Sequence, residues 1–222
     1  MTASLLPSIE LETAPNPGAS VIWLHGLGAD GNDFVPIVPE LGIPTSRPVR
    51  FIFPHAPVRA VTINNGFRMR AWYDISGADL TNRADLAGVR ESQSLVEALV
   101  ANERARGVPA SRIVLAGFSQ GGAIALYTGL RHAERLAGII ALSTYLVAPD
   151  KLSAERSEAN RGLSIFMGHG TADPVVRPEW GEASGRALVA LGYPVEWHSY
   201  GMPHSVCMEE VVAIGAWLRR VL

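Results

Sequence analysis

The chain has 222 residues, 48% of them hydrophobic, which suits one sizeable folded domain spanning residues 1–222. Its 19 basic and 21 acidic residues leave a net charge of -2 without any basic tract, which excludes nucleic acid as a partner. The chain has a single cysteine, no basic and apolar leader in residues 1–12, and no apolar run of about 18 residues, so we expect a cytoplasmic protein without a transmembrane segment.

Short β-branched runs alternate with longer amphipathic stretches, which predicts repeated strand–helix units and a parallel sheet buried on both faces. Strands are expected at 19–25, 49–53, 112–118, 136–142, 163–167 and 195–200, with an added edge strand at 9–13. Helices are expected at 33–41, 85–106, 120–131, 178–191 and 208–222. Stretches 54–77 and 144–161 look irregular, apart from a short hairpin around the Asn65-Gly66 turn. The sequence therefore predicts an α/β fold.

A first glycine motif follows the strand expected at 19–25. Residues 26–31 (GLGADG) satisfy the G-x-G-x-x-G pattern of dinucleotide-binding turns. That interpretation also needs an acidic residue about 20 positions further on to bind the ribose. No Asp or Glu occurs between Glu40 and Asp74, so the sequence disfavours a nucleotide cofactor. A tight strand-to-helix connection remains the alternative.

A second glycine motif, residues 117–121 (GFSQG), lies where a predicted strand ends and a predicted helix begins. A sharp turn at this point needs small residues on either side and exposes the serine hydroxyl at the carboxyl edge of the sheet. Ser119 is therefore a candidate nucleophile. A plain glycine-lined turn between a strand and a helix is the alternative interpretation.

A serine nucleophile needs a histidine base and a carboxylate that orients it. In an open parallel sheet, chemistry gathers beyond the carboxyl ends of the strands. His204 follows the last predicted strand and Asp173 follows the one before it, whereas His132 and His198 fall at a helix end and inside a strand. Asp173 could instead cap a turn. The order Ser119, Asp173, His204 is the order that α/β-hydrolases use.

Cleavage of an ester also needs two hydrogen-bond donors for the oxyanion. In the α/β-hydrolase arrangement these are the N–H that follows the nucleophile and an N–H from an early strand-to-helix loop. Gln120 and Leu27 occupy these places, so the first glycine motif is better explained as an oxyanion loop.

These residues resemble the phospholipase/carboxylesterase family, which includes bacterial carboxylesterases and the acyl-protein thioesterases or lysophospholipases of eukaryotes. The resemblance is carried by segments 24–31 (LHGLGADG), 53–57 (FPHAP), 70–74 (RAWYD), 117–122 (GFSQGG), 169–176 (HGTADPVV) and 202–204 (MPH), and segment 29–33 (ADGND) looks more like the carboxylesterases. It implies an α/β-hydrolase fold, a mostly parallel central sheet flanked by helices without a large lid domain. It also puts the nucleophile, acid, base and two oxyanion donors at the same five positions.

The leading hypothesis is a serine carboxylesterase that hydrolyses small to medium acyl esters through an acyl-enzyme, without a metal or other cofactor. An acyl-protein thioesterase or lysophospholipase with the same triad is the close alternative, and a non-catalytic binding protein on the same fold is a remote one. Leu27, Trp72, Tyr145 and Leu146 are candidates for the acyl groove, although each could instead lie in the core. We expect a small-molecule ester or thioester substrate and a monomer or homodimer.

Overall fold

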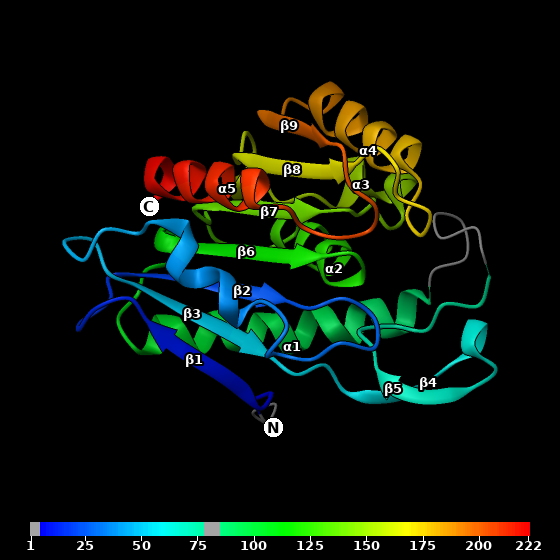
Figure 1. Cartoon of the computed structure of the whole chain (residues 1–222), viewed down its shortest axis with the longest axis horizontal. Helices are drawn as coiled ribbons and strands as arrows, with labels where there is room; N and C mark the ends of the chain where they lie inside the picture. Colours follow the sequence, from blue (N-terminus) through cyan, green and yellow to red (C-terminus); the bar gives the residue numbers. More distant parts are fainter. Residues whose placement is uncertain (1–4, 78–84) are drawn as a thin grey trace.

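The computed structural model describes residues 5–77 and 85–222, and within them seven strands form one twisted sheet (Figure 1). The strands run in the order β1-β3-β2-β6-β7-β8-β9. The β1 strand is antiparallel to β3, and every other neighbouring pair is parallel. Their bounds are β1 (Ser8–Glu12), β2 (Ala19–Leu24), β3 (Val49–Pro54), β6 (Ile113–Phe118), β7 (Gly138–Leu142), β8 (Ile165–Gly170) and β9 (Val195–Tyr200).

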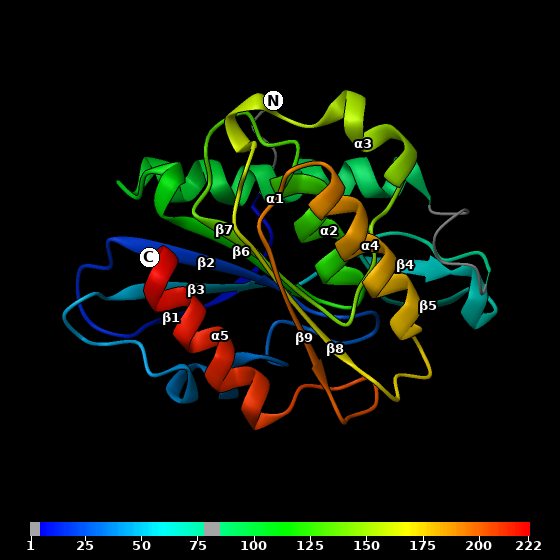
Figure 2. The same cartoon turned by 90° about the horizontal axis from the view of Figure 1, so that it is seen from above.

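Helices cover both faces of this sheet, and they are α1 (Leu86–Ala105), α2 (Gln120–Gly129), α3 (Pro149–Glu155), α4 (Pro178–Ala190) and α5 (Met208–Val221). Figure 2 shows α1 to α4 on one side of the sheet and α5 on the other. Two apolar clusters follow from this arrangement, one beneath α1, α2 and α4 and the other beneath α5. Every residue of β2, β3, β7 and β8 is buried as a result. This double burial explains why most residues of those strands are apolar.

The predicted strands are confirmed, with ends that shift by up to three residues. Two helical segments differ from expectation. Residues 33–41 contain a 3₁₀ helix (Val35–Leu41) instead of an α-helix, since two of its seven residues are prolines and lack the N–H that a longer ladder needs. Stretch 144–161 was expected to be irregular but contains α3, a helix too short to show a periodic pattern.

The predicted hairpin is also confirmed. Strands β4 (Val58–Val61) and β5 (Phe67–Arg70) pair in antiparallel fashion, and Asn65 and Gly66 between them have φ angles of 54° and 75°. The left-handed backbone of these two residues closes the turn, as an Asn-Gly pair favours.

Among the described residues, no helix is both long and apolar enough to cross a membrane.

Candidate active site

Ser119 occupies a strained turn between β6 and α2. Its φ of 54° and ψ of −120° put a non-glycine residue at positive φ, which costs energy unless neighbouring contacts hold it. Two such contacts exist, because the Ser119 N–H donates to the carbonyl of Leu142 at 2.8 Å and the Thr144 hydroxyl donates to the carbonyl of Ser119 at 2.7 Å. Ser119 is only half-buried, so the turn presents its side chain to a pocket.

Glycines make this turn possible by close backbone approach. A Cβ on Gly117 would lie 2.3 Å from the backbone of Gly121, and one on Gly121 would lie 2.3 Å from the carbonyl oxygen of Leu24. Larger residues would separate β6, α2 and the end of β2. The small residues expected on either side of Ser119 are therefore required by packing.

Asp173 and His204 meet at the carboxyl ends of β8 and β9. The Asp173 carboxyl group is buried, and its Oδ2 lies 2.6 Å from Nδ1 of His204. Its Oδ1 accepts the backbone N–H groups of Val175 and Val176 at 2.8 and 2.9 Å. Because a carboxylate oxygen accepts hydrogen bonds, Nδ1 of His204 is the donor in its contact with Asp173.

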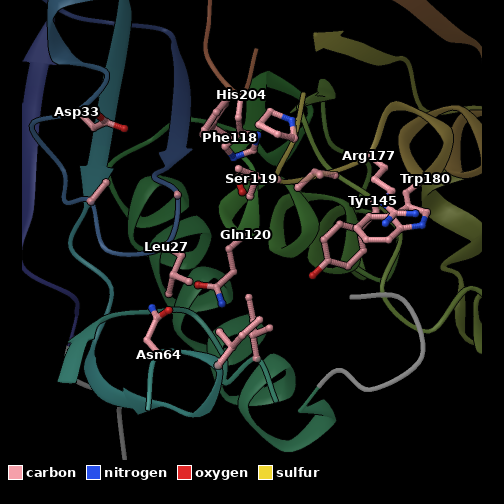
Figure 3. A pocket seen from close by; sticks show the side chains of 17 residues that line it. Leu27, Asp33, Asn64, Phe118, Ser119, Gln120, Tyr145, Arg177, Trp180 and His204 are labelled. Carbon is pink, nitrogen blue, oxygen red and sulfur yellow. The ribbon is translucent and has the colours of Figure 1, made fainter. Parts of the chain in front are cut away.

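Ser119 and His204 line the same pocket, which has a volume of about 490 Å³ and is drawn in Figure 3. The ring of His204 packs on Phe118, with ring centroids 4.6 Å apart. An apolar wall of the pocket comes from the β4–β5 hairpin and its following segment, from the loop after β7, and from the region around α4. These wall residues are Ile63, Ile75, Tyr145, Val176 and Trp180, with Asn64 and Arg177 beside them.

Of the four candidate groove residues, Leu27 and Tyr145 line this pocket. Trp72 and Leu146 are not among the residues that line it, and both lie in the core, which was the alternative for each of them. Trp72 is completely buried, and its indole N–H donates to the carbonyl of His25 at 2.9 Å. Leu146 is buried under α4, where its backbone N–H donates to the Ser184 hydroxyl at 2.9 Å. Both belong to the apolar cluster beneath α1, α2 and α4.

The two candidate oxyanion donors, Leu27 and Gln120, lie on opposite sides of Ser119 in the sequence but line one pocket. Gln120 is the first residue of α2, where backbone N–H groups have no partner within the helix and attract negative charge. Its side chain is buried, with Oε1 accepting the Trp72 N–H at 2.8 Å and Nε2 donating to the Tyr73 carbonyl at 2.7 Å. The side-chain amide of Gln120 is therefore hydrogen-bonded within the core.

The histidines set aside from the sequence lie outside the pocket lining. Nδ1 of His132 lies 2.6 Å from a carboxylate oxygen of Glu97, and the ring of His198 stacks on Phe166 at 4.9 Å. His25 was not singled out from the sequence, although it directly precedes the GLGADG loop. The apolar wall of the pocket was not predicted either, since no local pattern marks residues 63, 75, 176 and 180 as neighbours.

A family model described as phospholipase/carboxylesterase matches residues 8–222. The chain belongs to that family. Acyl-protein thioesterase 1 of Neurospora crassa is 41% identical over 223 residues, which cover 96% of this chain and 89% of that protein. Among solved structures, SOBER1 of Arabidopsis thaliana superposes with a TM-score of 0.86 at 31% identity, covering 91% of this chain and 98% of its own. Esterase PE8 superposes with a TM-score of 0.83 at 30% identity, covering 99% and 100%.

Membership of the phospholipase/carboxylesterase family makes this protein a hydrolase that acts on esters, with the α/β-hydrolase fold that the resemblance implied. No lid domain stands over the sheet in the described ranges. The GLGADG loop lies on the pocket through Gly26, Leu27 and Ala29, which suits this family better than a nucleotide-binding turn.

Glu210 on α5 is a fully buried residue that packs against β8. A Cβ on Gly168 of β8 would lie 1.9 Å from one of its oxygens, so the carboxyl packs tightly on that strand. Neither oxygen has a hydrogen-bond partner among the residues that the structure describes. Burial raises the pKa of Glu210 from its ordinary value of 4.5 to about 8.

This raised pKa predicts that the free energy of unfolding falls as the pH rises from 4.5 to about 8. Over that range the folded protein keeps the Glu210 proton and the unfolded chain loses it, which gives a slope of about 1.4 kcal/mol per pH unit. Glu210→Gln removes the titration, so its stability relative to wild type should increase steadily with pH. Urea unfolding of both proteins at intervals between about pH 5 and 8 measures the two slopes.

Glu209→Gln is the matched control, because Glu209 is exposed and its pKa is lowered, so it titrates below this range. It should keep the wild-type slope. Equal slopes in wild type and Glu210→Gln would show that Glu210 is ionised in the folded protein.

Proposed function

We propose that the protein is a serine carboxylesterase that hydrolyses small to medium acyl esters through an acyl-enzyme intermediate. Ser119 is the nucleophile, His204 the base and Asp173 the acid that orients it. The observation that carries this proposal is the 2.6 Å contact between His204 Nδ1 and Asp173 Oδ2, on a histidine that shares a pocket with Ser119 at a strained turn.

In this mechanism Asp173 keeps the proton on Nδ1 of His204, so Nε2 takes the proton from the Ser119 hydroxyl as its oxygen attacks the ester carbonyl. The oxyanion that forms accepts hydrogen bonds from the backbone N–H groups of Gln120 and Leu27. His204 then gives the proton to the departing alcohol, which leaves Ser119 acylated. A water molecule attacks the acyl-enzyme by the same route, and Ser119 regains its proton.

The lining of the pocket supports the proposal that the substrate carries an apolar acyl chain. Its volume of about 490 Å³ falls in the ordinary range for small-molecule sites. The wall formed by Ile63, Ile75, Tyr145, Val176 and Trp180 suits an acyl chain, which would be buried there without any polar partner. Burial raises the pKa of Tyr145 to about 12, so its hydroxyl stays neutral and bonded to that of Tyr73 at 2.6 Å.

A thioesterase is the second candidate, and the similarity to an acyl-protein thioesterase 1 supports it. The same nucleophile and oxyanion donors serve oxygen esters, thioesters and lysophospholipids, because the attacked carbonyl and the oxyanion are common to all three. The difference lies in the length of the acyl chain and in the leaving group.

The proposal predicts hydrolysis of p-nitrophenyl acetate, butyrate and decanoate in the presence of EDTA, with kcat/KM higher for butyrate than for a palmitoyl thioester assayed beside them. Activity in EDTA is expected because the mechanism needs no metal. A palmitoyl thioester with the highest kcat/KM would instead favour the thioesterase. Turnover of none of these substrates by the folded protein would leave the binding-protein alternative.

We also propose that residues 1–222 act as one domain, as a monomer or homodimer in the cytoplasm, which suits a protein whose single cysteine, Cys207, is free.

A further inference from the structure

His25 directly follows β2, and its buried imidazole makes two hydrogen bonds to the backbone. The N–H of Ala56 donates to its Nε2 at 3.1 Å, and its Nδ1 lies 2.7 Å from the carbonyl oxygen of Gly26. Because Nε2 accepts, the ring proton belongs on Nδ1, which donates to Gly26. Burial, the largest influence on this ring, lowers the pKa of His25, so the neutral form that this pattern needs is favoured.

The Gly26 carbonyl belongs to the same peptide unit as the N–H of Leu27. In a trans peptide the C=O and the N–H point in opposite directions, so a group that holds one also directs the other. We propose that His25 is a positioning residue for the oxyanion hole, holding the Gly26 carbonyl so that the Leu27 N–H faces the carbonyl oxygen of the substrate. This inference rests on the proposed function, because it assumes that Leu27 is an oxyanion donor.

Trp72 connects His25 to the second donor. Its indole N–H donates to the carbonyl of His25 at 2.9 Å, and the two rings lie 5.4 Å apart. The backbone N–H of Trp72 donates to the side chain of Gln120 at 2.8 Å. All three side chains are buried, so His25, Trp72 and Gln120 form a brace that fixes the two proposed donors relative to each other. This role accounts for the burial of Trp72 away from the groove.

The distance between the two donors matters because an oxyanion hole stabilises the transition state only if its N–H groups already point at the position of the oxyanion. Loss of one donor costs about 10² to 10³ in kcat in a known serine protease, and a donor that points wrongly loses part of that. A defect in the brace should therefore lower kcat and leave KM nearly unchanged, since the oxyanion exists only in the transition state.

The test compares His25→Asn with His25→Gln on p-nitrophenyl butyrate. The amide nitrogen of asparagine occupies the place of Nδ1 and can still donate to the Gly26 carbonyl. The amide of glutamine instead reaches the place of Nε2, so the Gly26 carbonyl loses its donor. We expect His25→Asn to keep a kcat at least about tenfold above that of His25→Gln, with KM values within about twofold. The affinity for an alkyl trifluoromethyl ketone, whose adduct with Ser119 carries the oxyanion, should differ between the two variants by a similar factor.

The matched control is the pair His132→Asn and His132→Gln, because His132 is also buried but lies outside the pocket lining. Both should keep the wild-type kcat and inhibitor affinity. Equal kcat values for the two His25 variants would overturn the proposal, as would a loss confined to stability with the inhibitor affinity unchanged.

Trp72→Phe decides the matter if the His25 variants do not fold. It keeps an aromatic ring and removes the N–H that holds the His25 carbonyl. We expect it to lower kcat and inhibitor affinity together by about threefold or more, and an unchanged kcat in the folded variant would overturn the proposal. An inactive wild type would instead contradict the proposed function itself, because the inference concerns only differences between active proteins.

Discussion

Ser119→Ala is expected to lower kcat by about a millionfold, which corresponds to about 8 kcal/mol in the activation free energy. The large effect follows from the mechanism, because without the hydroxyl no acyl-enzyme can form and the base has no proton to remove. Binding should change little, since the alanine fits the same half-buried position. The measurement is kcat on p-nitrophenyl butyrate, together with labelling of the wild-type protein by a fluorophosphonate and location of the modified residue.

Ser143→Ala provides a matched control for this experiment. Ser143 follows β7, the strand next to β6, and its φ of 45° is also positive. Its side chain is buried and its N–H donates to the carbonyl of Gly168, so it is a strained serine at the same edge of the sheet without access to substrate. Ser143→Ala should keep nearly full activity and full labelling. Labelling of a residue other than Ser119 would show that the nucleophile has been misassigned.

The sequence predicted the fold because the fold depends on local signals that recur in order, and the positions of the candidate triad follow from the same signals. The run 113–118 is apolar throughout, since the sheet is covered on both faces, and the helix α2 follows it directly. Asp173 and His204 follow neighbouring strands. Because β8 and β9 are parallel, Oδ2 of Asp173 lies 2.6 Å from Nδ1 of His204. The order of the strands in the sheet thus determines that two residues distant in the sequence lie close together.

The wall of the pocket could not be predicted in the same way. Tyr145 faces the pocket while its neighbour Leu146 faces the core, and the residues after β7 form no regular element whose period would tell these directions apart. Trp72 has a large apolar side chain near the site, yet its indole N–H donates to the His25 carbonyl in the interior. Whether a side chain faces the pocket or the core thus depends on buried polar groups that need hydrogen-bond partners. Those partners come from distant parts of the chain.

Asp173→Asn should lower kcat by up to about 10⁴-fold while the protein keeps its fold. The amide oxygen can still accept the backbone N–H groups of Val175 and Val176 at the place of Oδ1. The amide nitrogen then faces Nδ1 of His204 and donates to it, so the ring proton moves to Nε2. A histidine with its proton on Nε2 cannot take the proton of Ser119, and the hydroxyl loses its base.

The comparison for this prediction uses two other aspartates, measured by kcat on p-nitrophenyl butyrate after circular dichroism shows that each variant is folded. Asp33 lines the pocket and Asp150 is exposed on α3, so they separate a general effect of removing charge near the substrate from a specific effect on the base. We expect Asp33→Asn to lose little activity and Asp150→Asn almost none. If Asp33→Asn lost as much as Asp173→Asn, removal of a charge near the pocket would explain both losses, and the assignment of Asp173 as the acid that orients His204 would fail.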